Sequence, residues 1–269
     1  DNSDIARITR LSRRAQGSLT LMVDWNDPRT ARSGLGASPS LNGEVLGKAG
    51  TYDQGLRRHM LSIYNYMASG VLLSGIVALL FASSGMAAQV MATPLRWVIM
   101  LAPLGFVFAM SLGANRFATS TLQALFWGFC VIMGLSLSTI FLVFTGTSIA
   151  TTFFATAGAF AGLSLFGYTT KRSLSAMGSF MAMGLIGILI AMVINIFLQS
   201  SGLALAISIL GVVIFAGLTA WDTQRLKQEY AMVAGTEWAG KAVVLGALTL
   251  YLDFINMFQF LLSFLGNRE

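Results

Sequence analysis

Seven long apolar stretches follow one another from residue 60 onward, and they constrain the fold more than any other feature of the chain. A helix needs about 20 mostly apolar residues to cross roughly 30 Å of hydrocarbon. Strands do not suit these stretches, because an open strand in lipid leaves backbone groups without hydrogen-bond partners. We therefore predict an all-α membrane protein with seven transmembrane helices. The predicted spans are 60–82, 95–113, 122–144, 149–168, 174–198, 203–221 and 242–265.

The distribution of charge supports this class and divides the chain into two regions. Only 10% of the 269 residues are charged, against roughly 25% in soluble domains. Residues 1–59 contain nine of the 17 lysines and arginines and six of the 11 acids. We predict a disordered, basic N-terminal tail over residues 1–50 and a membrane domain over residues 51–269. The net charge of +6 is explained by loop charges, so we expect no nucleic-acid partner.

The basic residues also predict the orientation in the membrane. From residue 51 onward, eight of them fall on one side of the predicted spans and two on the other. Because cytoplasmic loops carry an excess of Lys and Arg, the N terminus is expected in the cytoplasm. Seven spans place the C terminus outside, whereas a re-entrant last segment would return it to the cytoplasm. The eight are Arg57, Arg58, Arg116, Lys171, Arg172, Arg225, Lys227 and Lys241.

The counts of cysteine and histidine exclude several kinds of metal site. Cys130 is the one cysteine, so neither an intramolecular disulfide nor a thiolate cluster can form. His59 is the one histidine, which excludes a site built from several imidazoles. We therefore expect no resident cofactor.

A polar stripe runs along the last predicted span, around 250-LYLDFINMFQFLL-262. Residues three or four positions apart share one face of a helix. The stripe should face the bundle interior or a water-filled cavity, and Asp253 should point inward. An acid at mid-membrane costs about 2.5 to 3.5 kcal/mol on insertion scales, so such acids usually have a partner and a function. The stripe consists of Gly246, Thr249, Asp253, Asn256, Gln259 and Ser263.

The expected partner of Asp253 is Asp222, in 217-GLTAWDTQRLK-227 at the end of the sixth span. Two carboxylates in a low dielectric cannot both ionise cheaply, so they are expected to share one proton. Loss of that proton would separate the two helices or free Asp222 to pair with Arg116. The two carboxylates also offer oxygen ligands suited to Ca²⁺. Alternatively, Asp222 merely caps a helix end and Asp253 is a neutral acid bonded to a neighbour.

Three segments resemble the Bax inhibitor (transmembrane Bax inhibitor motif) family, in particular its bacterial YccA-like branch. They are AWDTQRLK, LTLYLDFINMFQFLLSFLG and 52-YDQGLRRHMLSIYNYMASGVLLSG-75, and the resemblance covers residues 51–266. It implies a seven-helix bundle with the last helix at the centre. It also implies a pH-sensitive Ca²⁺ leak channel in which Asp222 and Asp253 share a proton and Arg116 changes partners. An extra acid of some relatives is missing from the second span, which has Gly105 among apolar residues.

The resemblance implies a place in the bacterial inner membrane and suggests an alternative function. Bacterial relatives are substrates and modulators of the membrane-anchored ATP-dependent protease FtsH, which they enter through a cytoplasmic tail. The alternative is therefore a non-conducting regulatory protein that binds or inhibits such a protease. If the protein is a leak channel, the expected partners are the lipid bilayer and Ca²⁺ or protons, with Ca²⁺ as a permeant or bound ion.

Two other classes with similar features fit less well. Intramembrane aspartyl proteases place a glycine-containing motif before one catalytic acid, whereas Trp221 precedes Asp222 and Leu252 precedes Asp253. Those glycines allow the substrate backbone to approach closely. A retinal protein needs a lysine within the last helix, and Lys241 lies at or before its start. We expect no enzymatic activity.

Overall fold

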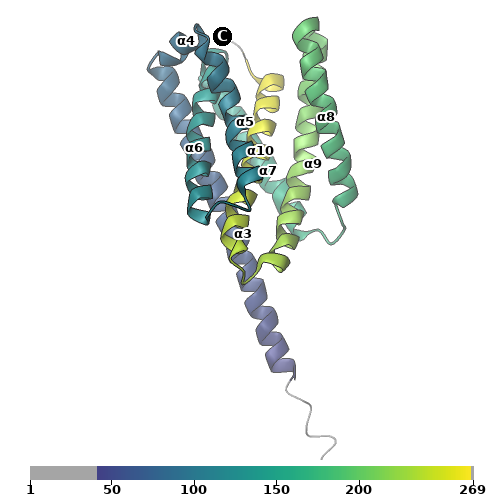
Figure 1. The fold of residues 1–269 in the computed structure, drawn as a ribbon. Helices are drawn as coiled ribbons and strands as arrows, with labels where there is room; N and C mark the ends of the chain where they lie inside the picture. Colours follow the sequence, from purple (N-terminus) through teal and green to yellow (C-terminus); the bar gives the residue numbers. More distant parts are fainter. Residues whose placement is uncertain (1–40, 268–269) are drawn as a thin grey trace, which may run out of the picture. The chain divides into compact units, whose positions relative to one another are not determined.

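The computed structural model describes residues 41–267, and the regular structure in this range is helical (Figure 1). Predictions about residues 1–40 and 268–269 lie outside the described residues. The chain divides after Asp53 into two compact units, and the bundle described below starts at Gln54. The helices are α3 (Leu41–Ser83), α4 (Met86–Met91), α5 (Leu95–Gly113), α6 (Thr119–Leu137), a 3-10 turn (Ser138–Leu142), α7 (Gly146–Thr169), α8 (Ser175–Leu198), α9 (Ser201–Val233) and α10 (Trp238–Leu265).

The seven predicted spans are confirmed. Within the described residues, seven helices are long and apolar enough to cross a membrane, and they correspond one to one with the predicted stretches. The boundaries of α5 coincide with those predicted, and those of the other spans differ by a few residues at one or both ends, apart from the two extensions described next. The protein is therefore an all-α, multi-pass membrane protein.

Two helices extend well beyond their predicted apolar limits. Residues 41–50, predicted to be disordered, are helical and form the start of α3. The sixth span was predicted to end at residue 221, but α9 continues to Val233. Its extension, DTQRLKQEYAMV, consists mostly of good helix formers, and lengthening an existing helix requires no new nucleus. Asp222 therefore lies inside α9, and the alternative in which it caps a helix end is wrong.

The last helix is the centre of the bundle, as predicted. In its most apolar window 61% of the residues of α10 are buried inside the protein, against 6% for α8. Helices α6, α7 and α9 pack directly on α10, which is the yellow helix of Figure 1. Leu250 and Tyr251 in the middle of α10 are fully buried. Asp253 is held on this least exposed helix.

Two glycines allow other helices to approach α9 just before Asp222. A methyl group at Gly167 of α7 would overlap the carbonyl oxygen of Ala220. A methyl group at Gly178 of α8 would overlap the ring of Trp221. Small residues at such positions are a common basis of helix packing in membranes. The middle of α9 is therefore fixed against α7 and α8 immediately next to the predicted site.

Candidate functional site

Asp222 of α9 and Asp253 of α10 face each other inside the bundle, as the sequence predicted. They are 5% and 4% exposed. Their side chains are within hydrogen-bonding reach of each other. Oδ1 of Asp222 and Oδ2 of Asp253 have no hydrogen-bond donor among the described residues. Two contacting carboxyl groups that receive so little help from other donors are well suited to share a proton between them.

The cation beside the pair is Arg225. Its Nη2 atom lies 2.8 Å from Oδ1 of Asp222, in an ion pair that lacks the alignment of a hydrogen bond. The guanidinium also lies over the ring of Trp221, 5.0 Å from its centroid. The Arg225 side chain is 46% exposed, so it connects the buried pair with the surface of the bundle.

Arg116, the third predicted site residue, lies elsewhere. It is exposed in the turn between α5 and α6, and its backbone N–H donates to the carbonyl oxygen of Gly113. No ion pair among the described residues joins Arg116 to either acid. The same turn is connected to the start of α10, because Nζ of Lys241 donates to the carbonyl oxygen of Ala114 at 3.2 Å. A movement of α10 would therefore pull on the turn that carries Arg116.

Sequence reasoning missed Arg225 as the partner of Asp222. The available signal was the spacing of three residues, which places both on one face of a helix. It was missed because the helix was taken to end at residue 221, where hydropathy falls. Once α9 is known to continue, the ion pair follows from local geometry alone.

Polar contacts made by the residues after Asp222 fix α9 to its neighbours. Gln224 is bonded at both ends of its amide, so it is held firmly against the turn between α7 and α8. The other contacts reach α7 itself. The contacts are Gln224 Nε2 to the Arg172 carbonyl (2.8 Å), Leu174 N–H to Gln224 Oε1 (2.8 Å), Thr223 Oγ1 to Ser164 Oγ (3.2 Å) and Lys227 Nζ to the Tyr168 carbonyl (2.8 Å).

A different set of contacts fixes α10 on its other side. The hydroxyl of Tyr251 lies 2.6 Å from Oγ of Ser74 in α3, and Ser74 donates to the carbonyl oxygen of Cys130 in α6 at 2.7 Å. Tyr251 and Asp253 are two residues apart, so they point to nearly opposite sides of the helix. The aspartate pair thus connects α9, which the contacts above hold against α7 and α8, with α10, which is held against α3 and α6.

Two hollows flank the pair along the contact between α9 and α10. The first, here called the inner hollow, has a volume of about 490 Å³ and lies toward the end predicted to be cytoplasmic. The second, the outer hollow, has a volume of about 460 Å³ and also borders α8. The polar residues of the inner hollow are Arg225, Gln228, Glu229 and Thr249. Those of the outer hollow are Asn195, Ser208, Asn256, Gln259 and Ser263.

The predicted polar stripe of α10 runs from one hollow to the other. Gly246 and Thr249 line the inner hollow, and the last three stripe residues line the outer one. Asp253 lies between these two groups in the sequence and is buried. On α9, Phe215 lines the outer hollow on the side nearer Asp222 and stacks on Phe260, with 5.9 Å between ring centroids. The pair and this stack therefore separate two hollows that each have several polar side chains among mainly apolar ones.

The site offers few ligands for a tightly held metal ion. No group of three or more His, Cys, Asp or Glu side chains occurs in the described part of the chain. Ca²⁺ takes six to eight oxygen ligands, and the pair supplies two carboxyl groups. The arrangement is better suited to a proton, or to a cation in transit that keeps part of its water, than to a resident metal.

The fold and the site define a class: a helical multi-pass membrane protein with two acids in contact inside the bundle. A family model described as "inhibitor of apoptosis-promoting Bax1" matches residues 56–269. A protein of Rickettsia prowazekii is 48% identical over 220 residues, which cover 81% of this chain and 93% of that protein. The inner membrane protein YbhL of Escherichia coli K12 is 42% identical over 219 residues, covering 80% and 94%. The chain belongs to the Bax inhibitor family.

Proposed function

We propose that this protein is a pH-sensitive cation leak pathway of the bacterial inner membrane, with Ca²⁺ as the permeant ion and no catalytic activity. The observation that carries the proposal is the position of the Asp222–Asp253 pair between two hollows on one helix contact, each of which has several polar side chains in its lining. Opening that contact would join the hollows. Carboxyl oxygens at the narrowest point attract a hard divalent cation.

The charges around the pair suggest where the proton resides in the closed state. Asp222 has the Arg225 guanidinium beside it, whereas Asp253 has no cation of its own among the described residues. We therefore assign the charge to Asp222 and the proton to Asp253, whose O–H donates to Asp222. If both ionised, two unit charges about 4 Å apart would repel by about 4 kcal/mol at an effective dielectric of about 20. That repulsion would act to separate α9 from α10.

The direction of the pH response follows from proton counting. The closed state binds one more proton than a state in which both acids are ionised, so raising the pH favours the open state. Once open, Asp222 and Asp253 are available to a passing cation, and Arg116 would compete with Arg225 for Asp222. Leak should therefore increase with pH until both acids are ionised.

Ca²⁺ flux into proteoliposomes, measured between about pH 6 and 8, tests the proposal, since one proton changes a two-state population by up to about tenfold per pH unit. Wild type should show flux that rises with pH. Complete absence of flux, or flux that does not depend on pH, would contradict the leak pathway. Absence of flux would favour the alternative of a non-conducting regulator that binds a membrane-anchored ATP-dependent protease. Co-purification with such a protease would then be the next measurement.

A further inference from the structure

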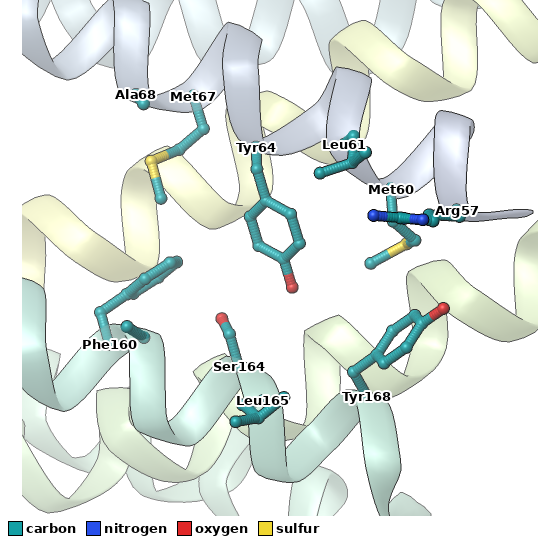
Figure 2. Close-up of a pocket in the computed structure, with 11 residues that line it drawn as sticks. Arg57, Met60, Leu61, Tyr64, Met67, Ala68, Phe160, Ser164, Leu165 and Tyr168 are labelled. Atoms are coloured by element: carbon teal, nitrogen blue, oxygen red, sulfur yellow. The ribbon is translucent and has the colours of Figure 1, made fainter.

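A lateral groove between α3 and α7 lies on another side of the bundle (Figure 2). We call it the α3–α7 groove; it has a volume of about 540 Å³, within the usual range of small-molecule sites. Met60, Met67 and Phe160 form a buried apolar floor. Leu61 and Leu165 form its rims and are 49% and 63% exposed. The groove therefore opens sideways, toward the lipid.

The groove has one cationic end. Arg57 lines it there, is exposed, and forms no ion pair with any described residue. Figure 2 shows Arg57 and Tyr168 at the same end, with Phe160 and Met67 at the other. Nζ of Lys227 lies over the Tyr168 ring, 4.9 Å from its centroid, so it adds a second positive charge nearby. One end of the groove is thus suited to an anion and the rest to hydrocarbon.

Two hydroxyl groups lie in the middle of the groove. In Figure 2 the hydroxyl of Tyr64 and that of Ser164 point toward each other from α3 and α7. Ser164 accepts a hydrogen bond from Thr223, the residue after Asp222. No hydrogen bond of the Tyr64 hydroxyl is found among the described residues. A ligand in the groove would therefore find a free hydroxyl between the cationic end and the apolar end (Figure 2).

We propose that the α3–α7 groove binds an anionic phospholipid, with its phosphate at Arg57 and one acyl chain over the floor formed by Met60, Met67 and Phe160. Arg57 precedes the predicted first span by three residues, which places it at headgroup depth on the basic side of the bundle. Basic pockets between transmembrane helices on that side are typical sites for anionic headgroups. A purely apolar partner helix would leave the Arg57 charge without a counterion.

The lipid site would lie on α7, which packs on both α9 and α10, the helices that carry the aspartate pair. Two hydrogen bonds join groove residues to α9, from Thr223 to Ser164 and from Lys227 to the carbonyl oxygen of Tyr168, so occupancy of the groove supports the packing of α7 on α9. Binding itself does not depend on whether the protein conducts ions, and it can be measured separately.

Native mass spectrometry of the full chain, extracted in a mild detergent and titrated with phosphatidylglycerol or phosphatidylcholine, tests the proposal. Wild type should retain one phosphatidylglycerol in preference. Arg57→Gln should weaken that preference about fivefold, the effect of about 1 kcal/mol per basic residue near an anionic surface. Arg58→Gln is the matched control, because Arg58 is exposed next to Arg57 but does not line the groove. Equal retention of the two lipids by wild type would overturn the proposal.

A second variant tests the hydrocarbon part. Ala161 lines the groove, and Ala161→Trp should fill it and reduce retention of phosphatidylglycerol while leaving all charges in place. The control is Ala159→Trp, since Ala159 is exposed on α7 but lies outside the groove. Helix content measured by circular dichroism identifies a variant that fails to fold. If folded Arg57→Gln and Ala161→Trp both retain the lipid as wild type does, the groove is not its binding site.

Discussion

Two faces of α10 differ in how their polar side chains are paired. One face packs on α3 and α6, and the other packs on α9. On the first face, Tyr251 is fully buried and its hydroxyl reaches Ser74, which in turn bonds to Cys130. On the second, Asp222 and Asp253 are buried, and each has one carboxyl oxygen that accepts no hydrogen bond from the described residues, although Arg225 forms an ion pair with that oxygen of Asp222. Satisfied polar networks make a structure rigid, whereas partly satisfied ones are costly. We therefore call the side of α10 that packs on α3 and α6 the rigid face, and the side that packs on α9 the releasable face, since the proposed opening would separate α10 from α9.

The hollows follow the same division. Both flank the contact between α9 and α10, and Phe215 and Phe260 stack between helices on that side. The opposite face is filled by aromatic side chains, with Phe126 and Phe129 in edge contact with Tyr251. Close packing resists small displacements. An opening movement should therefore begin at the α9 face.

The largest effect is expected from Asp253→Asn, which removes the titratable partner from the releasable face. An amide is neutral at every pH, so the rise of Ca²⁺ flux with pH, up to about tenfold per unit for one proton, should disappear. Asn256→Ala is the control, because Asn256 lies one turn further along the stripe and does not titrate. It should change the size of the flux and keep its pH dependence. A normal pH profile in Asp253→Asn would disprove the latch.

Ser74→Ala should weaken the contact between α10 and α3 on the rigid face. That change leaves the buried Tyr251 hydroxyl without its partner and should cost about 1 to 3 kcal/mol of stability. Thermal unfolding in detergent measures the loss. Tyr251→Phe should cost less, because Ser74 keeps the carbonyl oxygens of Cys130 and Gly70 as acceptors. If Ser74→Ala removed the pH response of the flux while leaving stability unchanged, the assignment of the two faces would be reversed.

Arg225→Gln should have a moderate effect that separates two possible partners of Asp222. Removing a positive charge beside the pair favours its protonated form, so the midpoint of the flux curve should move to higher pH. Because Arg225 is partly exposed and screened, the shift should be about one pH unit or less. Arg116→Gln serves for comparison and should move the midpoint less. A larger shift with Arg116→Gln would make Arg116 the main partner.

The smallest effect is expected at the outer end of the releasable face. Ser208 Oγ donates to Ser263 Oγ across α9 and α10 at 3.1 Å. Hydrogen bonds between membrane helices contribute about 0.6 kcal/mol on average, so Ser263→Ala should lower the unfolding midpoint only slightly. A loss as large as that of Ser74→Ala would show that the α9 face is as firmly held as the opposite one.

The sequence by itself determined the seven spans, the central last helix through its family resemblance, and the inward direction of Asp253. These features follow from properties of single segments. The thickness of the hydrocarbon layer fixes the length of a span, and an acidic side chain within the membrane is stable only when it faces the bundle interior or water. The length of α9 was missed because hydropathy, not helix propensity, was used to end it. For the same reason, the contact between Arg225 and Asp222 was not predicted.

Only the tertiary structure decided how the helices are rotated and spaced against one another. That arrangement brings Asp222 of α9 against Asp253 of α10, leaves Arg116 without an ion pair to either acid among the described residues, and opens the hollows on either side of the pair. It also places Arg57 at one end of the α3–α7 groove. Such features depend on side chains from helices far apart in the sequence, and a pattern of apolar and polar residues along one helix carries no information about the face that its neighbour presents.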